Sequence, residues 1–276
     1  MTTGVFAAVL LAALMHASWN AWVKGGEDRF ASIIAMSAGQ SLLAILLLPV
    51  VGLPPAHAWP WVAASAALHT GYKVTLVNAY ERGDLSQIYP LARGSAPLIV
   101  GAAGAIFLAE VPPPLRLAAV AAIGGGILLM ALGRGRLSRS ALLLALGTAA
   151  FTAGYTVVDG LGARVSGDAS AFIVLSIALD GPLMLAYGLA ARGRKATDAL
   201  RSGWVQGLAA GGVSGGAYWI VVWAFTQAPL ALVAALRETS VLFAMLIAAV
   251  FLKEPVPPRR WAAAGLIVAG IALMRL

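Results

Sequence analysis

Two stretches of the sequence decide the fold: residues 93–130 read RGSAPLIVGAAGAIFLAEVPPPLRLAAVAAIGGGILLM, and residues 237–274 read RETSVLFAMLIAAVFLKEPVPPRRWAAAGLIVAGIALM. Aligned without a gap at an offset of 144 positions, they share 16 identities in 38 positions. The matches that do not depend on abundant alanine and leucine are Arg93 with Arg237, Glu110 with Glu254, Arg116 with Arg260, Pro113 with Pro257, Pro114 with Pro258 and Gly126 with Gly270. The chain therefore contains an internal repeat, which is clearest in the last part of each half.

The composition places this repeat in a membrane. Of the 276 residues, 61% are hydrophobic and only 11% are charged, against roughly a quarter charged in a soluble domain. The absence of cysteine excludes a disulfide framework and a cysteine-based metal site. The net charge of +8 is carried by residues in short gaps between apolar runs, which is typical of membrane proteins and does not indicate nucleic-acid binding. We predict an all-α integral membrane protein.

Ten apolar runs are long enough to cross a bilayer core, which is about 30 Å thick and needs about 20 helical residues. The predicted helices cover residues 3–23, 30–51, 61–81, 85–109, 114–132, 140–159, 169–190, 204–226, 230–252 and 258–275. Five fall in each half, 1–136 and 137–276, so the second half enters the membrane from the opposite side. The prediction is therefore two inverted five-helix repeats around a central cavity, an arrangement typical of carriers that work by alternating access.

The distribution of basic residues predicts the orientation. The gaps after odd-numbered helices hold 13 Lys and Arg residues, whereas the other side of the membrane holds 3. Because basic residues accumulate on the cytoplasmic side, both termini are expected outside the cytoplasm.

Polar residues inside the predicted spans are the candidates for a functional site, since a charge at mid-bilayer costs about 2.5–3.5 kcal/mol on insertion scales. Lys73 lies near the middle of its helix, where the alternative to a substrate role is a structural ion pair with Asp180. Asp159 falls at a predicted helix end, so a place among the headgroups is expected. The residues predicted to bind substrate or line the cavity are His16, Trp19, Asn20, Lys73, Tyr80, Tyr89, Arg93, Tyr155, Trp223, Arg237 and Glu238, and the candidates for ion coupling are Asp180 and Glu238.

An enzyme is not favoured. The run Gly212–Gly216 matches G-x-S-x-G around Ser214, and also the G-x-S-G pattern of rhomboid-type intramembrane proteases. A nucleophile elbow needs a strand-to-helix turn, however, and the same glycines are typical of closely packed membrane helices. No second histidine lies at metal-ligand spacing from His16, and the sequence contains neither a nucleotide-binding loop nor a channel filter. We expect no metal, no cofactor and no catalysis.

Two motifs resemble a known family. The opening LLAALMHASWN at 10–20, followed by Lys24, and the closing segments LRETS at 236–240 and FLKE at 251–254 are similar to EamA-type members of the drug/metabolite transporter superfamily. The resemblance implies a ten-helix carrier of the bacterial inner membrane with a cavity between two five-helix halves. Within the superfamily, the chain resembles amino-acid exporters of the YddG type. Eukaryotic relatives are drawn with cytosolic termini, whereas the basic residues here predict the reverse.

The functional prediction is a secondary transporter that exports small polar or amphipathic metabolites, with amino acids as the leading class. The alternatives are efflux of organic cations or drugs and, from another class, an intramembrane serine hydrolase. A zwitterion needs a cation for its carboxylate, for which Lys73, Arg93 or Arg237 qualifies. Its ammonium needs a carboxylate or an aromatic face, supplied by Glu238, Trp19, Tyr80 or Trp223. Proton coupling and facilitated diffusion both fit the sequence, and a monomer is compatible with it.

Overall fold

The computed structural model describes residues 1–24, 28–82, 85–107, 109–131, 138–250, 253 and 255–276, and within these ranges the chain is helical without a strand. The elements are α1 Thr3–Lys24, α2 Arg29–Val51, the short 3-10 helix η1 Ala56–Ala58, α3 Trp59–Arg82, α4 Leu85–Phe107, α5 Pro114–Ala131, α6 Arg139–Ser166, α7 Ala169–Arg192, α8 Arg194–Gln227, α9 Leu230–Glu238, α10 Ser240–Val250 and α11 Pro258–Leu273. The predicted boundary between the halves, at 136 and 137, lies outside the described residues.

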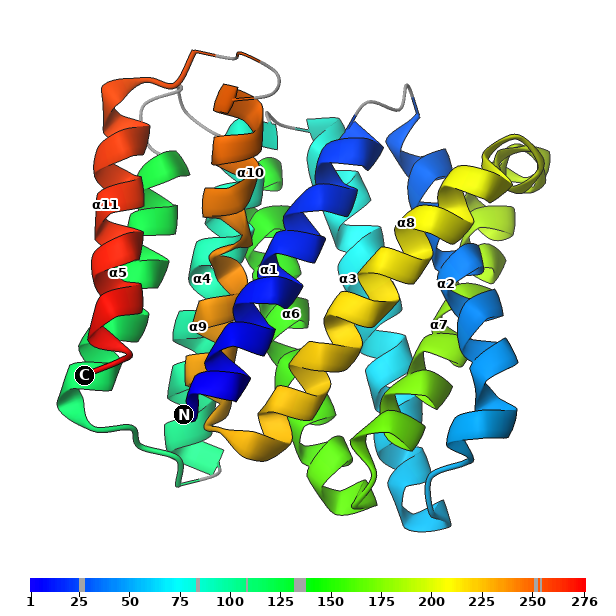
Figure 1. Cartoon of the computed structure of the whole chain (residues 1–276). Helices are drawn as coiled ribbons and strands as arrows, with labels where there is room; N and C mark the ends of the chain where they lie inside the picture. Colours follow the sequence, from blue (N-terminus) through cyan, green and yellow to red (C-terminus); the bar gives the residue numbers. More distant parts are fainter. Residues whose placement is uncertain (25–27, 83–84, 108, 132–137, 251–252, 254) are drawn as a thin grey trace.

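The long helices run back and forth between two ends of one bundle (Figure 1). We call one end the basic face, because it carries Arg29, Arg82, Arg139, Arg192 and Arg194. We call the other end the terminal face, because both chain termini lie there (Figure 1).

Eight segments of the described chain are long and apolar enough to cross a membrane, and α9 and α10 together form one of them. The other two predicted spans correspond to α3 and α11. α3 has 24 residues but carries several polar side chains, among them His69 and Lys73. α11 has only 16 residues, fewer than the roughly 20 that a full crossing needs.

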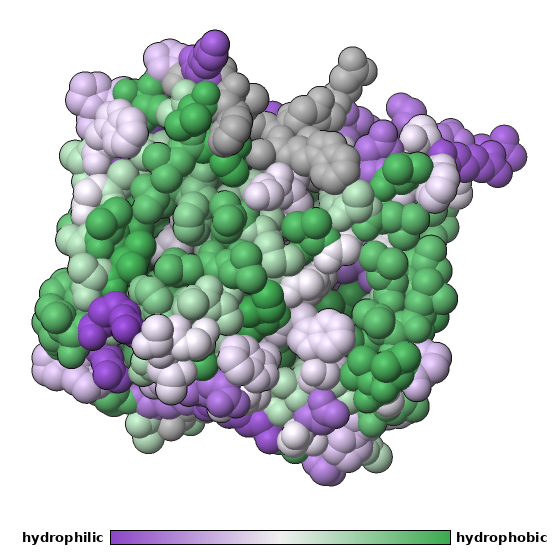
Figure 2. Space-filling model, viewed as in Figure 1, coloured by the Kyte–Doolittle hydropathy of each residue, from purple (hydrophilic) through white to green (hydrophobic). Residues whose placement is uncertain are grey.

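The outer surface between the two faces is apolar. In Figure 2, hydrophilic residues gather along the upper and lower edges of the molecule, and the area between them is mostly hydrophobic. Leu46 on α2 and Val268 on α11 expose 64% and 52% of their surface. Such exposure is unfavourable in water but matches lipid tails, so the chain is a multi-pass membrane protein.

Two helices differ from the predicted ones. The predicted span 230–252 is interrupted at Thr239, which separates α9 from α10 and donates its hydroxyl to the Leu236 carbonyl at 2.7 Å. The predicted helix 140–159 continues to Ser166, where Gly167 ends it at φ +71°. The longer α6 places Asp159 two turns inside the helix, which corrects its expected place among the headgroups.

At one edge of the bundle, α5 and α11 pack side by side and run in opposite directions (Figure 1). A Cβ on Gly126 would lie 3.0 Å from the carbonyl oxygen of Ala263, and a Cβ on Gly270 would lie 2.9 Å from that of Ala119. Glycine at both positions lets the two backbones approach this closely. Each of these glycines therefore meets the other helix at equivalent distances.

Candidate functional site

A cavity of about 490 Å³ lies inside the bundle, within the range of small-molecule sites. It is lined by residues of α1, α2, α3, α4, α5, α6, α7, α8, α10 and α11. Of the residues predicted for the site, His16, Trp19, Asn20, Lys73, Tyr80, Tyr89, Arg93, Tyr155 and Asp180 line this cavity. The fold therefore gathers side chains from distant parts of the sequence around one space.

The cavity reaches further toward the basic face than toward the terminal face. Its lining includes Arg29, Tyr80, Met130 and Arg260, each within two turns of the helix end at that face. Toward the terminal face the lining is less extensive. Ile173, on the second turn of α7, lies near that face, whereas the lining residues of the other helices lie more than two turns from it. A substrate could therefore enter from the basic face.

The terminal face is tied together by Arg164 and Glu110. Arg164 pairs with Glu110 and also donates to the carbonyl of Phe225 at 2.9 Å and to that of Ala228 at 3.2 Å. Glu110 accepts a hydrogen bond of 3.0 Å from the backbone nitrogen of Leu230, the first residue of α9. A carboxylate at a helix N-terminus is favourable because it meets unpaired N–H groups. These contacts join α6, the segment before α5 and the α8–α9 turn.

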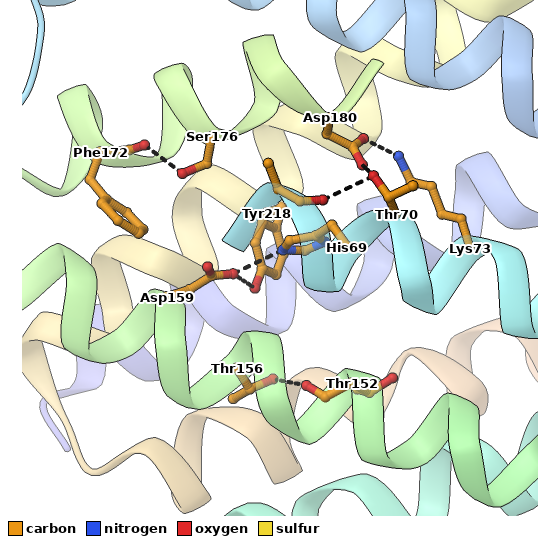
Figure 3. Close-up of polar contacts among 11 residues, drawn as sticks. His69, Thr70, Lys73, Thr152, Thr156, Asp159, Phe172, Ser176, Asp180 and Tyr218 are labelled. Atoms are coloured by element: carbon orange, nitrogen blue, oxygen red, sulfur yellow. Dashed lines mark hydrogen bonds and ion pairs between the residues drawn. The ribbon is translucent and has the colours of Figure 1, made fainter. Parts of the chain in front are cut away.

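Lys73 and Asp180 form a buried ion pair on the cavity wall (Figure 3). Lys73 also donates to the Ser37 hydroxyl at 2.8 Å, and Thr70 donates to the other Asp180 oxygen at 3.3 Å. The side chains of the pair expose only 8% and 7% of their surface. The ion pair that the sequence suggested for Lys73 is therefore present, and it lies where a substrate could contact it.

Asp180 is positioned by a hydroxyl from α2. Pro182 cannot donate to the helix ladder, and the Ser41 hydroxyl inserts just before it. This hydroxyl donates to the Ile177 carbonyl at 2.6 Å and accepts from the Gly181 nitrogen at 2.8 Å. A Cβ on Gly181 would lie 2.3 Å from the same oxygen, so this contact needs glycine at position 181. The Ser41 hydroxyl thus bridges α7 at this point and holds Asp180 toward Lys73.

A second charged cluster joins α4 to α9. Arg93 and Arg237 both contact Glu238, with Arg93 Nε at 2.6 Å from one carboxylate oxygen and Arg237 Nη2 at 2.9 Å from the other. All three are buried, and Arg93 also donates to the Ser240 hydroxyl at 3.2 Å. Two guanidinium groups and one carboxylate leave one positive charge in excess, and Arg93 lies on the cavity wall.

Three predicted site residues are not part of the cavity lining. Arg237 and Glu238 lie behind the wall, since both point into the contact between α4 and α9. Trp223 is 40% exposed and borders a shallow depression with Gly216, Trp219 and Ile220 on the outside of α8. Tyr218, on another side of the same helix, lines the cavity. Trp223 therefore borders the outside of α8 instead of the cavity, which corrects its predicted place.

A third polar cluster contains residues that were not predicted for the site. The Nε2 of His69 lies 2.9 Å from an Asp159 carboxylate oxygen, and the Tyr218 hydroxyl donates to the same oxygen at 2.5 Å (Figure 3). The ring of Tyr155 stacks on that of His69 with centroids 4.1 Å apart. The helical spacing of the sequence already places His69 one turn before Lys73, on the same side of α3.

Ser214 lines the cavity from the middle of α8. Its neighbourhood is a helix–helix contact, because a Cβ on Gly211 would lie 2.5 Å from the backbone nitrogen of Gln40 in α2. The glycines around Ser214 thus serve close packing, and Ser214 itself lies within a continuous helix instead of at a strand-to-helix turn.

Comparisons with known proteins agree with this architecture. A search of curated proteins finds no match. One solved structure, described as "Crystal structure of protein", is similar with a TM-score of 0.78 and 17% sequence identity, and the match covers 100% of this chain and 99% of that chain. At this identity the likeness concerns the fold, and it extends over the whole bundle. The model of the EamA-like transporter family matches residues 139–276, half of the sequence, so the chain belongs to the EamA-like transporter family and is a membrane transporter of the drug/metabolite type.

Proposed function

We propose that this chain is a secondary transporter that exports small amphipathic metabolites, with amino acids as the leading class, by alternating access. The observation that carries the proposal is the cavity with Lys73, Asp180 and Arg93 on its wall, which reaches further toward the basic face than toward the terminal face. A cavity that reaches further toward one face than toward the other is expected of a carrier that admits a solute from one side of the membrane at a time.

The paired charges favour a zwitterion over a cation. A bound amino acid can give its carboxylate to Lys73 and its ammonium to Asp180, so that both members of the pair keep a partner. A simple cation would take Asp180 and leave Lys73 as a buried charge without compensation, which is strongly unfavourable. Arg93 brings the excess positive charge of its cluster to the cavity wall, which also favours the carboxylate of a bound amino acid. The aromatic rings of Trp19, Tyr80, Tyr89 and Tyr155 offer the apolar surface that the rest of the solute needs.

Two inverted five-helix halves, 1–136 and 137–276, would supply the motion. The contact between α5 and α11 supports this proposal, because Gly126 and Gly270 are equivalent positions of the repeat, as are Ala119 and Ala263. Such reciprocity is expected of two units related by a two-fold axis. In this proposal α3 and α11 also cross the membrane and complete ten spans.

The basic face is assigned to the cytoplasm of a bacterial cell by the positive-inside rule. The cavity is then open to the cytoplasm, which is the state in which an exporter takes up its substrate. Both termini would lie outside.

Counterflow in proteoliposomes tests the proposal. Vesicles that contain the full-length protein are loaded with an unlabelled mixture of the proteinogenic L-amino acids and diluted into the same mixture in radiolabelled form. We expect the label to accumulate transiently, and an excess of the unlabelled mixture outside to abolish the accumulation. Radiolabelled tetraphenylphosphonium serves as the organic-cation probe. Accumulation of this cation without the amino acids would contradict the proposal and favour drug efflux.

A further inference from the structure

Three acidic side chains are buried among the residues that the structure describes: Asp159, Asp180 and Glu238. Asp180 is neutralised by Lys73, and Glu238 by two arginines. Asp159 differs from both, because its hydrogen-bond partners are His69 and Tyr218. Neither partner carries a permanent charge, so the charge of this cluster depends on a proton.

The geometry leaves room for that proton. His69 and Tyr218 both contact Oδ2 of Asp159, while Oδ1 is buried and has no hydrogen-bond partner among the described residues. A buried carboxylate oxygen without a donor is unfavourable. A proton bound by the cluster, on the imidazole or on the carboxylate, reduces this cost by neutralising the charge.

The cluster can be reached from the cavity through the His69 imidazole ring. His69 and Tyr218 line the cavity, whereas Asp159 is absent from the lining and is 0% exposed. Figure 3 shows the His69 and Tyr218 side chains converging on Asp159. Cavity water can therefore reach the imidazole, and the Asp159 carboxylate lies directly behind it.

The other two buried carboxylates, Asp180 and Glu238, are already neutralised by permanent cations, unlike the His69–Asp159 pair. The charged or titratable residues on the surrounding elements include His16 on α1, His57 on η1, Tyr72 and Lys73 on α3, Tyr89 and Arg93 on α4, Tyr155 and Arg164 on α6, Asp180 on α7, Tyr218 on α8, and Arg237 and Glu238 on α9. Protonation of Asp180 would leave Lys73 unpaired, and protonation of Glu238 would leave two guanidinium groups together. A proton on the His69–Asp159 pair leaves no permanent charge without its partner.

We propose that Asp159, His69 and Tyr218 form the proton-binding site by which this carrier couples substrate export to the inward movement of H⁺. The inference rests on the proposed function. One proton binds while the cavity faces the terminal side and leaves while it faces the basic side; the only bond formed and broken is the one to that proton.

The site is placed to act on the conformation. It joins α3 of the first half to α6 and α8 of the second. With the proton bound, an imidazolium faces a carboxylate and holds α3 against α6; without it, a weaker neutral-to-charged hydrogen bond remains. Lys73 lies one turn further along the same side of α3. Substrate at Lys73 and a proton at His69 therefore act on the same helix.

The experiment measures proton movement and substrate exchange on the same vesicles. Proteoliposomes are loaded with pyranine and the mixture of proteinogenic L-amino acids, the membrane potential is clamped with valinomycin and potassium, and the vesicles are diluted into buffer without amino acids. Wild-type protein should acidify the lumen as the amino acids leave. His69→Gln and Asp159→Asn should lose this acidification and keep counterflow of the radiolabelled mixture, because exchange of substrate for substrate needs no net proton transfer.

Matched controls are His57→Gln, on η1 at the terminal face, and Asp198→Asn, on the exposed start of α8; both should acidify the lumen as wild type does. If Asp159→Asn fails to fold, His69→Gln decides, since glutamine keeps a donor toward Asp159. Acidification that persists in His69→Gln would overturn the proposed site. Wild-type counterflow without acidification would overturn the coupling and leave the transport function standing. Wild-type protein without counterflow would refute the proposed function, and this inference with it.

Discussion

Lys73 and Asp180 carry opposite charges in a part of the bundle where each is almost fully shielded from solvent. Removing one member leaves the other as an uncompensated buried charge, at a cost of about 3–5 kcal/mol. We predict that Lys73→Met and Asp180→Leu each lower the free energy of unfolding by this order. The double variant Lys73→Met/Asp180→Leu should recover most of the stability but lose amino-acid counterflow, because the pair is then absent as a binding site. Denaturation in mixed micelles and counterflow measure the two effects separately.

The matched control is Lys195→Met/Asp198→Leu, which removes an opposite pair of charges from the exposed start of α8. It should change the free energy of unfolding by no more than a few tenths of a kcal/mol, as expected for exposed charges. Its amino-acid counterflow should match that of the wild type. Amino-acid counterflow that survives in the buried double variant would show that the pair serves the fold alone.

At the scale of single residues, the sequence indicates which side chains are costly in a membrane but not which way they point. The pairing of Lys73 with Asp180 could be suggested because both lie deep in their predicted helices. The sequence does not show that Tyr218 rather than Trp223 lines the cavity, because lipid and protein interior are equally apolar and hydrophobic periodicity does not define the inner side of α8. The expectation that Asp159 lies among the headgroups follows from ending the predicted helix at residue 159, where the apolar run gives way to a charge. The helix continues because Arg164, one turn beyond, finds partners at the terminal face.

At the scale of elements, the contact of α5 with α11 gives a direct test of the repeat. Ala at Gly126 or Gly270 would push a methyl group against a backbone carbonyl of the other helix, and overpacking of this kind costs about 1–3 kcal/mol. We predict that Gly126→Ala and Gly270→Ala destabilise the protein by similar amounts, measured as the free energy of unfolding in mixed micelles. The adjacent Gly125 and the nearby Gly265 have open space at the Cβ position. Gly125→Ala and Gly265→Ala should be neutral or slightly stabilising, and unequal costs at Gly126 and Gly270 would argue against two-fold related contacts.

The helices themselves were largely predictable, because long apolar runs between charged or proline-rich gaps leave few alternatives in a bilayer. The break at Thr239 was not, since 230–252 is apolar on both sides of it and the interruption depends on tertiary contacts. Arg237 and Glu238 end α9 facing Arg93, a contact that no local pattern reveals. Part of the internal repeat has a visible structural reason, because two of its matched residues, Gly126 and Gly270, lie on α5 and α11, where the packing requires glycine.

At the scale of the whole molecule, the two ends of the bundle differ: the cavity reaches the basic face, and Arg164 and Glu110 join three segments at the terminal face. Alternating access requires these ties to break when the cavity opens outward. They are partly exposed, with 31% and 19% of the two side chains accessible, so their individual contribution is modest and their role is to bias an equilibrium. The closed terminal face is thus a state that a small change can shift.

A cysteine placed at Ile173 can report this equilibrium, because the natural chain contains no cysteine and Ile173 is the lining residue nearest the terminal face. With Arg164 and Glu110 intact, we predict that a membrane-impermeant maleimide labels Ile173→Cys from the basic face of inverted vesicles and only slowly from outside intact cells. Adding Arg164→Gln or Glu110→Gln should raise the labelling rate from outside several-fold, since either change removes the tie across α6, α9 and the segment before α5. Leu53→Cys, an exposed position at the terminal face, is the control and should label from outside equally in every background. If Leu53→Cys is labelled only in inverted vesicles, the proposed orientation is wrong. If the labelling rate of Ile173→Cys from outside is unchanged by both Arg164→Gln and Glu110→Gln, other contacts close this face.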